Sequence, residues 1–173
     1  MYEIIHSEIV YKGKVFDVRV DQVRLESGKV IQVDIVQHNG AIVIVPIDQE
    51  GNIWFVDQYR HAAGETLLEL PAGTLEDQEE PLSSAQRELR EEIGMSASKI
   101  TPLGEFYITP GYSTEYLYIF LAENLTPDPL PLDEDEVITV VKAPINQVFQ
   151  WVREKRIRDA KTLAALLLAQ PYL

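Results

Sequence analysis

The sequence GTLEDQEEPLSSAQRELREEIGM, Gly73–Met95, combines a dense charged cluster with the signals of a helix. Pro81 favours the first turn of a helix, and Gly94 favours its end. Between these two residues, apolar side chains recur at the spacing of one helical face, at positions Leu82, Ala85, Leu89 and Ile93. The stretch therefore predicts an amphipathic helix that starts at Pro81 and stops before Gly94.

Three glutamates lie on a different face of this helix. Because an α-helix advances about 100° per residue, Glu88, Glu91 and Glu92 share that face. Like charges four residues apart destabilise an isolated helix by roughly a few tenths of a kcal/mol, so a bound divalent cation is the candidate that would neutralise them. The alternative is an ordinary solvated face, on which Arg87 and Arg90 serve as neighbouring counter-charges.

The ligand chemistry of this face favours a hard cation. The chain has no cysteine, and its three histidines show no ligand spacing, so neither a thiolate site nor a His-based zinc site is supported. Carboxylate oxygens select Mg²⁺ most naturally, with Mn²⁺ as the other candidate. Glu88, Glu92 and the backbone carbonyl of Ala72 would form an open site of this kind, in which a diphosphate ester is attacked by water.

Composition limits the classes of partner. The chain has 173 residues, of which 46% are hydrophobic, and we expect a single domain over residues 1–173. No run of eighteen apolar residues is present and the N-terminus lacks the pattern of a signal peptide, so we expect a cytoplasmic protein with no membrane partner. The net charge of −13 repels nucleic acid, which is therefore not expected as a partner either.

Short β-prone runs separated by turns surround the predicted helix. Strands are expected at residues 3–10, 15–25, 30–37, 41–47, 53–60, 66–70, 99–108, 115–123 and 137–141. Two further helices are expected at residues 144–155 and 159–169, and the proline-rich, acidic stretch 124–136 is expected to be a surface loop. This order predicts an α+β fold in which a few helices cover a mixed sheet.

The stretch Gly73–Met95 resembles the Nudix box of the Nudix hydrolases. It matches G-x5-E-x7-R-E-U-x-E-E-x-G-U at every position, where U is a bulky apolar residue. Seven fixed positions give a chance match of order one in 10^8 per window. The resemblance implies a Nudix-type α/β/α sandwich with a mixed sheet, preceded by an N-terminal antiparallel β-hairpin region.

The same resemblance implies roles for individual residues. The implied metal ligands are the Ala72 carbonyl and the helix residues Glu88, Glu91 and Glu92. Glu91, Glu92 and Arg87 are also implied to be catalytic. Arg87 is expected to pair with the loop residue Glu79, which is then structural or an outer ligand.

Three strings outside the box are similar to the ADP-ribose pyrophosphatase branch of the family. The string FYITPGYSTE resembles its Pro-Gly loop, and the final residue, Glu115, is the implied general base or water-orienting residue. The strings DQYR and LELPAG resemble its QYR and E-x-P-A-G motifs, which implies that Arg60 and Glu69 line the substrate cleft. Read without the resemblance, Arg60 is a surface charge at a strand end and Glu115 is a solvated turn residue.

The resemblance to this branch extends over nearly the whole chain. In the branch the N-terminal strands cross to a partner subunit, which implies a homodimer in which residues 1–40 contribute to the dimer and residues 41–173 form the core. Phe16 is then placed to stack on adenine, with an ordinary core phenylalanine as the alternative. Val33 stands where branch members often carry an arginine, which leaves nucleobase recognition open.

The expected reaction is the Mg²⁺-dependent hydrolysis of the diphosphate bond of a nucleotide sugar, with ADP-ribose converted to AMP and ribose 5-phosphate. GDP-mannose or another nucleotide sugar is the nearest alternative substrate, and oxidised dNTPs come next. A non-catalytic nucleotide sensor is the alternative from a different class. Because Glu88, Glu91 and Glu92 are all present, an enzyme is favoured over a sensor.

Overall fold

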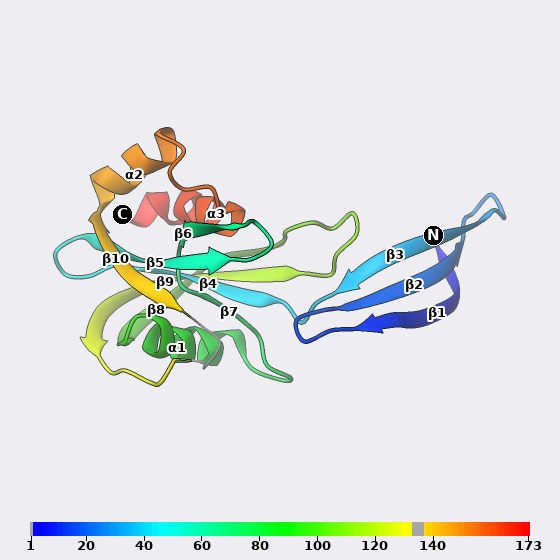
Figure 1. Ribbon diagram of the computed structural model, residues 1–173, viewed down its shortest axis with the longest axis horizontal. Helices are drawn as coiled ribbons and strands as arrows, with labels where there is room; N and C mark the ends of the chain where they lie inside the picture. The colour runs from blue at the N-terminus through cyan, green and yellow to red at the C-terminus, as the bar shows by residue number, and fades with distance from the viewer. Residues whose placement is uncertain (1, 133–136) are drawn as a thin grey trace. The chain divides into compact units, whose positions relative to one another are not determined.

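The computed structural model describes residues 2–132 and 137–173 (Figure 1). The chain divides into two compact units. The N-terminal unit consists of the residues up to Gly40 together with Phe106–Leu117, and the core unit consists of Ala41–Glu105 and Tyr118–Leu173. The expectation of one domain over residues 1–173 stays a prediction.

The N-terminal unit is built on an antiparallel sheet in the order β1-β2-β3. Its strands are β1 (Glu3–Lys12), β2 (Asp17–Arg24) and β3 (Val30–Gln37). A turn at Gly28, with φ of 81°, joins β2 to β3. The later segment adds to this unit through β3, because Val36 donates to the Tyr112 carbonyl at 2.8 Å and accepts from Thr114 at 3.0 Å. All ten residues of β1 are exposed, so within one chain this strand buries little apolar surface.

Two sheets form the centre of the core unit, in the orders β10-β5-β6 and β7-β4-β9-β8. Their strands are β4 (Ala41–Pro46), β5 (Asn52–Arg60), β6 (Glu65–Glu69), β7 (Ala72–Thr74), β8 (Met95–Tyr107), β9 (Tyr116–Pro127) and β10 (Ile138–Pro144). The helices are α1 (Pro81–Glu92), α2 (Ile145–Arg153) and α3 (Ala160–Ala169), followed by the 3₁₀ turn η1 (Gln170–Tyr172). In Figure 1, α1 lies on one side of the strands and α2 and α3 lie on the other. This arrangement of helices and strands confirms the α+β prediction.

The predicted helix α1 packs into the core by the face that the sequence indicated, with one exception. Ala85 and Leu89 are fully buried against Ile42, Ile44 and other apolar residues of the sheets. Leu82, in the first turn of the helix, was expected on the same face but is 52% exposed. The helix begins at Pro81 and the chain turns at Gly94, whose φ of 68° suits glycine.

Three boundaries differ from those expected. The strand β7, directly after Pro71, pairs with β4 and was not among the expected strands. A strand of three residues is too short to show an alternating pattern in the sequence. The strand β8 starts at Met95, four residues before the expected start at residue 99, and continues through Pro102. The strand β9 extends to Pro127, into the expected loop, and the acidic run 133–136 lies outside the described residues.

The two C-terminal helices pack on the core unit through their buried side chains. Val148 and Trp151 of α2 are buried, and the Trp151 ring lies 6.2 Å from that of Phe55. The helix α3 buries Leu166, whereas the neighbouring Leu167 is 68% exposed. No helix in the described ranges is long and apolar enough to cross a membrane. The expected cytoplasmic location stays a prediction.

Candidate active site

Arg87, in the middle of α1, holds three carboxylates. Its Nε and Nη2 donate to the two oxygens of Glu79 at 3.0 and 3.1 Å, which confirms the expected pair. Its Nη1 donates to Glu88 Oε1 at 2.7 Å and to Glu91 Oε2 at 2.8 Å. The hydrogen bond with Glu79 raises the pKa of Arg87, and the same bond lowers the pKa of Glu79. One guanidinium therefore links the loop that contains Glu79 to the acidic face of the helix.

Two further contacts join the acidic face to β7. Glu88 and Glu92 are buried, with exposures of 7% and 4%. Glu92 Oε2 accepts a hydrogen bond from the Ala72 N–H at 3.1 Å. A Cβ atom added to Gly73 would lie 1.7 Å from Glu88 Oε1, so only glycine lets this strand pass so close to the carboxylate. The expected metal ligands Ala72, Glu88 and Glu92 are thus brought together.

The donor set of this region fits a hard divalent cation bound through few protein atoms. Buried carboxylates approach a backbone segment, and Mg²⁺ takes such oxygen donors while it keeps waters or substrate phosphate as its other ligands. Within the described ranges, no group of three or more His, Asp or Glu side chains is already gathered as a metal cage. Glu91 and one oxygen of Glu88 accept hydrogen bonds from Arg87.

Arg60 and Glu69, the residues expected to line a substrate cleft, form an ion pair between β5 and β6. Arg60 Nε donates to Glu69 Oε1 at 2.8 Å, and Nη2 donates to Oε2 at 2.7 Å. Glu69 is only 1% exposed, whereas the Arg60 side chain remains 40% exposed. Burial pushes the pKa of Glu69 upward, but the bonds from Arg60 and the charge of Lys161 outweigh it and hold that pKa below its ordinary value.

Sequence reasoning missed the contribution of α3 to this pair. Lys161 donates from its Nζ to Glu69 Oε2 across a separation of 92 residues. Thr162 Oγ1 accepts from the Leu70 N–H at 2.9 Å, next to Glu69. Asp159 is a helix-capping residue that the sequence does signal, and it accepts from the Thr162 N–H at 2.9 Å. No local pattern predicts which distant strand such a helix start will contact.

Phe16 and Glu115, the other two predicted site residues, belong to the N-terminal unit. Phe16 is 42% exposed and its ring lies 6.3 Å from that of Tyr11, so within one chain it is not the core phenylalanine that was the alternative. Glu115 follows the Pro-Gly turn, which is closed by hydrogen bonds from Tyr112 and Ser113 to the Thr109 carbonyl. The Glu115 N–H donates to Ser113 Oγ at 3.1 Å, and its backbone accepts from Ile108 at 3.3 Å. The turn is therefore an ordered one.

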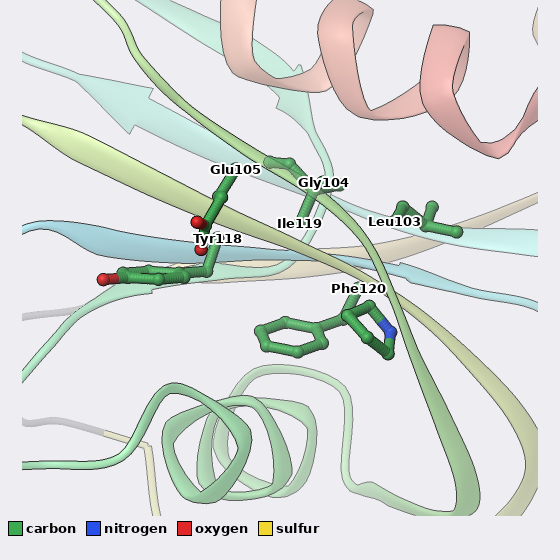
Figure 2. A pocket seen from close by; sticks show the side chains of 7 residues that line it. Leu103, Gly104, Glu105, Tyr118, Ile119 and Phe120 are labelled. Carbon is green, nitrogen blue, oxygen red and sulfur yellow. The ribbon is translucent and has the colours of Figure 1, made fainter.

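A hollow of about 300 Å³ lies between β8 and β9 of the core unit. Figure 2 shows the rings of Tyr118 and Phe120 on the same side of β9, with the Glu105 side chain beside Tyr118. None of the predicted site residues lines it. We therefore separate this hollow from the candidate site around Arg87.

The chain is similar in sequence and in structure to known proteins. The NUDIX domain matches residues 36–166. The chain is 39% identical to the ADP-ribose pyrophosphatase of Bacillus subtilis (strain 168) and 34% identical to a methanol dehydrogenase activator of Bacillus methanolicus. Each of these alignments spans 168 residues, 96% of this chain and 91% of the relative.

A GDP-mannose pyrophosphatase of Yersinia pestis (strain Pestoides F) is 38% identical over 143 residues, which cover 76% of this chain and 71% of the relative. A crystal structure of an ADP compounds hydrolase matches with a TM-score of 0.89 and 25% identity. That match covers 99% of this chain and 94% of the other. It confirms the predicted sandwich fold.

Proposed function

Because the chain belongs to the NUDIX family, whose domain covers residues 36–166, we propose that it hydrolyses ADP-ribose to AMP and ribose 5-phosphate. The observation that carries this proposal is the Arg87 cluster, in which one guanidinium holds Glu79, Glu88 and Glu91 beside β7. The similarity to the Bacillus subtilis ADP-ribose pyrophosphatase along nearly the full chain supports the choice of substrate.

Enzymes of this family generally use divalent metal ions, and we propose Mg²⁺ here, with Mn²⁺ as a substitute. The residues that would hold it are the Ala72 carbonyl, Glu88, Glu91 and Glu92. When bound, the cation supplies charge neutralisation on the diphosphate oxygens and so makes phosphorus more open to attack. The close approach of Glu88 and Glu92 to Gly73 and Ala72 supports this assignment, because it gathers oxygen donors of the kind that Mg²⁺ prefers.

The side chains of the chain have separate proposed tasks in the reaction. Arg87 remains protonated and keeps Glu91 oriented while Gly73 leaves room for Glu88. Glu115 orients the attacking water or accepts its proton as the new oxygen–phosphorus bond forms. The bond between that phosphorus and the bridging oxygen breaks, which leaves AMP and ribose 5-phosphate.

Substrate binding is assigned to Arg60, Glu69 and Phe16. Arg60 keeps N–H groups that Glu69 does not use, and these can donate to phosphate oxygens. Phe16 is exposed enough to stack on a nucleobase. We also propose that two chains pair through their N-terminal sheets, because β1 exposes apolar side chains that a partner would cover. Val33 leaves the choice of nucleobase to experiment.

A panel of substrates tests the proposal. Metal-stripped protein is supplied with Mg²⁺ and with ADP-ribose, GDP-mannose or an oxidised dNTP, and products are identified by mass spectrometry. We expect the highest kcat/KM for ADP-ribose, with AMP and ribose 5-phosphate as products. The relative from Yersinia pestis makes GDP-mannose the second candidate, and a clearly higher kcat/KM for it would refute our choice of substrate.

A further inference from the structure

Lys161, in the first turn of α3, is held between the carboxylates of Glu69 and Asp159. Its Nζ donates to Glu69 Oε2 and forms an ion pair with Asp159 Oδ2 at 3.0 Å. The Lys161 side chain is 16% exposed and that of Glu69 is 2% exposed. Because a lysine is rarely withdrawn from water to this extent without a compensating role, its place beside Glu69 needs an explanation.

Glu69 is shared by two cations that approach from different elements. Arg60 of β5 takes both of its oxygens, and Lys161 of α3 takes one of them again. With Asp159 included, the four charges alternate in sign and cancel. Loss of Lys161 would leave two carboxylates with one guanidinium, in a region where Glu92 already adds to the negative field at Arg60.

The backbone around Lys161 is fixed to the same strand end. The Asp159 carboxylate caps α3 through the Thr162 N–H, and the Thr162 hydroxyl accepts from the Leu70 N–H at 2.9 Å. Thr162 is fully buried. The backbone that carries Lys161 is therefore held in place by these hydrogen bonds. A residue that positions another group needs such a fixed backbone.

Arg60 is the part of this cluster that remains accessible. A guanidinium has five N–H donors, and the two bonds to Glu69 use only the Nε donor and one Nη2 donor. The plane of the guanidinium is set by Glu69, so the directions of the remaining donors depend on where that carboxylate is held. Lys161 fixes one oxygen of the carboxylate.

We propose that Lys161 is a positioning residue that fixes Glu69 and thereby aims the unused donors of Arg60 at phosphate oxygens of the nucleotide sugar. The inference rests on the proposed function. It assigns Lys161 no contact with substrate of its own. Its loss should therefore weaken binding through Arg60 and leave the chemical step largely unchanged.

The kinetic test compares Lys161→Met, Lys161→Arg and the unaltered protein with ADP-ribose and Mg²⁺. For Lys161→Met we expect KM to rise roughly tenfold and kcat to stay within about twofold, because Arg60 loses its fixed direction while the chemical step keeps its own groups. Lys161→Arg keeps the charge and should recover most of the loss. Lys99→Met is the matched control, since Lys99 forms its ion pair with Glu123 at a more exposed position.

A double-mutant cycle with Glu69→Gln separates action through Glu69 from direct contact with substrate. In the Glu69→Gln background, the additional effect of Lys161→Met on KM should shrink to within about twofold. An undiminished effect there would overturn the proposal, as would a fall in kcat at constant KM. Melting temperatures of all variants identify any that fail to fold, in which case Lys161→Arg and Glu69→Gln supply the comparison.

Calorimetric titration of ADP-ribose into the Glu92→Gln protein, with and without Lys161→Met, measures binding without turnover. The dissociation constant should rise by the same factor as KM, and an unchanged value would overturn the proposal. If the unaltered protein hydrolyses GDP-mannose instead of ADP-ribose, the proposed substrate fails, and the same variants are compared with that nucleotide. If it hydrolyses neither, the proposed function fails, and this titration alone decides the role of Lys161.

Discussion

Glu88 Oε1 occupies the space that a side chain at Gly73 would need, since an added Cβ atom would lie 1.7 Å from it. Gly73→Ala must therefore displace Glu88 or separate β7 from α1. We expect kcat for ADP-ribose to fall about 100-fold or more, because a misplaced group in an active site costs this much. Steady-state kinetics measure the loss. Gly111→Ala meets no atom within 4 Å and should keep its stability within roughly 0.5 kcal/mol.

Arg87→Met should destabilise the folded protein as well as inactivate it. The change leaves Glu79, Glu88 and Glu91 without the shared guanidinium, and loss of one partner from a largely buried ion pair costs about 3–5 kcal/mol. Because the Arg87 side chain is 26% exposed, we expect about 2–3 kcal/mol, measured by urea unfolding.

The control for this change is Arg90→Met in the same helix. Arg90 pairs with Asp128 at a more exposed position, so its replacement should cost less than about 1 kcal/mol. Equal losses for the two arginines would contradict the central role given to Arg87. Arg87→Lys should remain impaired, because one ammonium cannot reproduce the paired bonds to Glu79.

Glu92→Gln should separate catalysis from folding. Its carboxylate accepts from the Ala72 N–H, a bond that a glutamine oxygen can also accept, so the fold should survive. The negative charge needed by a divalent cation is lost, and we expect kcat to fall about 10³-fold while ADP-ribose still binds. Single-turnover kinetics and calorimetric binding test this. A variant as active as the unaltered protein would exclude Glu92 from the metal ligands.

Removal of divalent metal should abolish hydrolysis reversibly. Protein treated with EDTA and dialysed is expected to regain activity with Mg²⁺ and with Mn²⁺, but not with K⁺, since carboxylate oxygens prefer small hard divalent ions. The melting temperature should rise as Mg²⁺ is added, because a ligand of the folded state stabilises it by mass action. Full activity in excess EDTA would contradict the assigned metal dependence.

The stability of the protein should depend on the ionisation of Glu69 in a defined direction. Its pKa is below the ordinary value of 4.5 in the folded protein, so the folded state favours the charged form. The resulting stabilisation is fully present above pH 4.5 and is lost as pH falls through the lower folded value. Urea unfolding between pH 3 and 7 measures the free energy of unfolding of the unaltered protein and of Glu69→Gln. The difference between these two free energies should become smaller below about pH 4.

The sequence allowed the helix of the box and its loop to be predicted because their signals are local. Pro81, Gly94 and the Glu79–Arg87 pair lie within one short stretch, and helix periodicity and capping rules apply there directly. Leu82 broke the pattern because periodicity gives the direction of a side chain but not how far the sheet extends over it.

Contacts between distant segments could not be predicted in the same way. The ion pair of Lys161 with Glu69 depends on where α3 docks on the end of β6, and the two residues lie 92 positions apart. The close approach of Gly73 to Glu88 likewise depends on the pairing of β7 with β4, which no alternating pattern announced. The match to the Nudix box includes Gly73 and Glu88. The structure adds the steric reason why residue 73 must be glycine.

The N-terminal unit includes a segment, Phe106–Leu117, that lies much later in the sequence. Its sheet ends before Gly40, yet Val36 bonds to Tyr112 and Thr114 of the segment Phe106–Leu117. During synthesis at about 5–20 residues per second, the first strands leave the ribosome several seconds before this segment does. The edge of β3 that this segment later joins has no partner strand from this segment throughout that interval, and an open strand edge is a site of unwanted strand pairing.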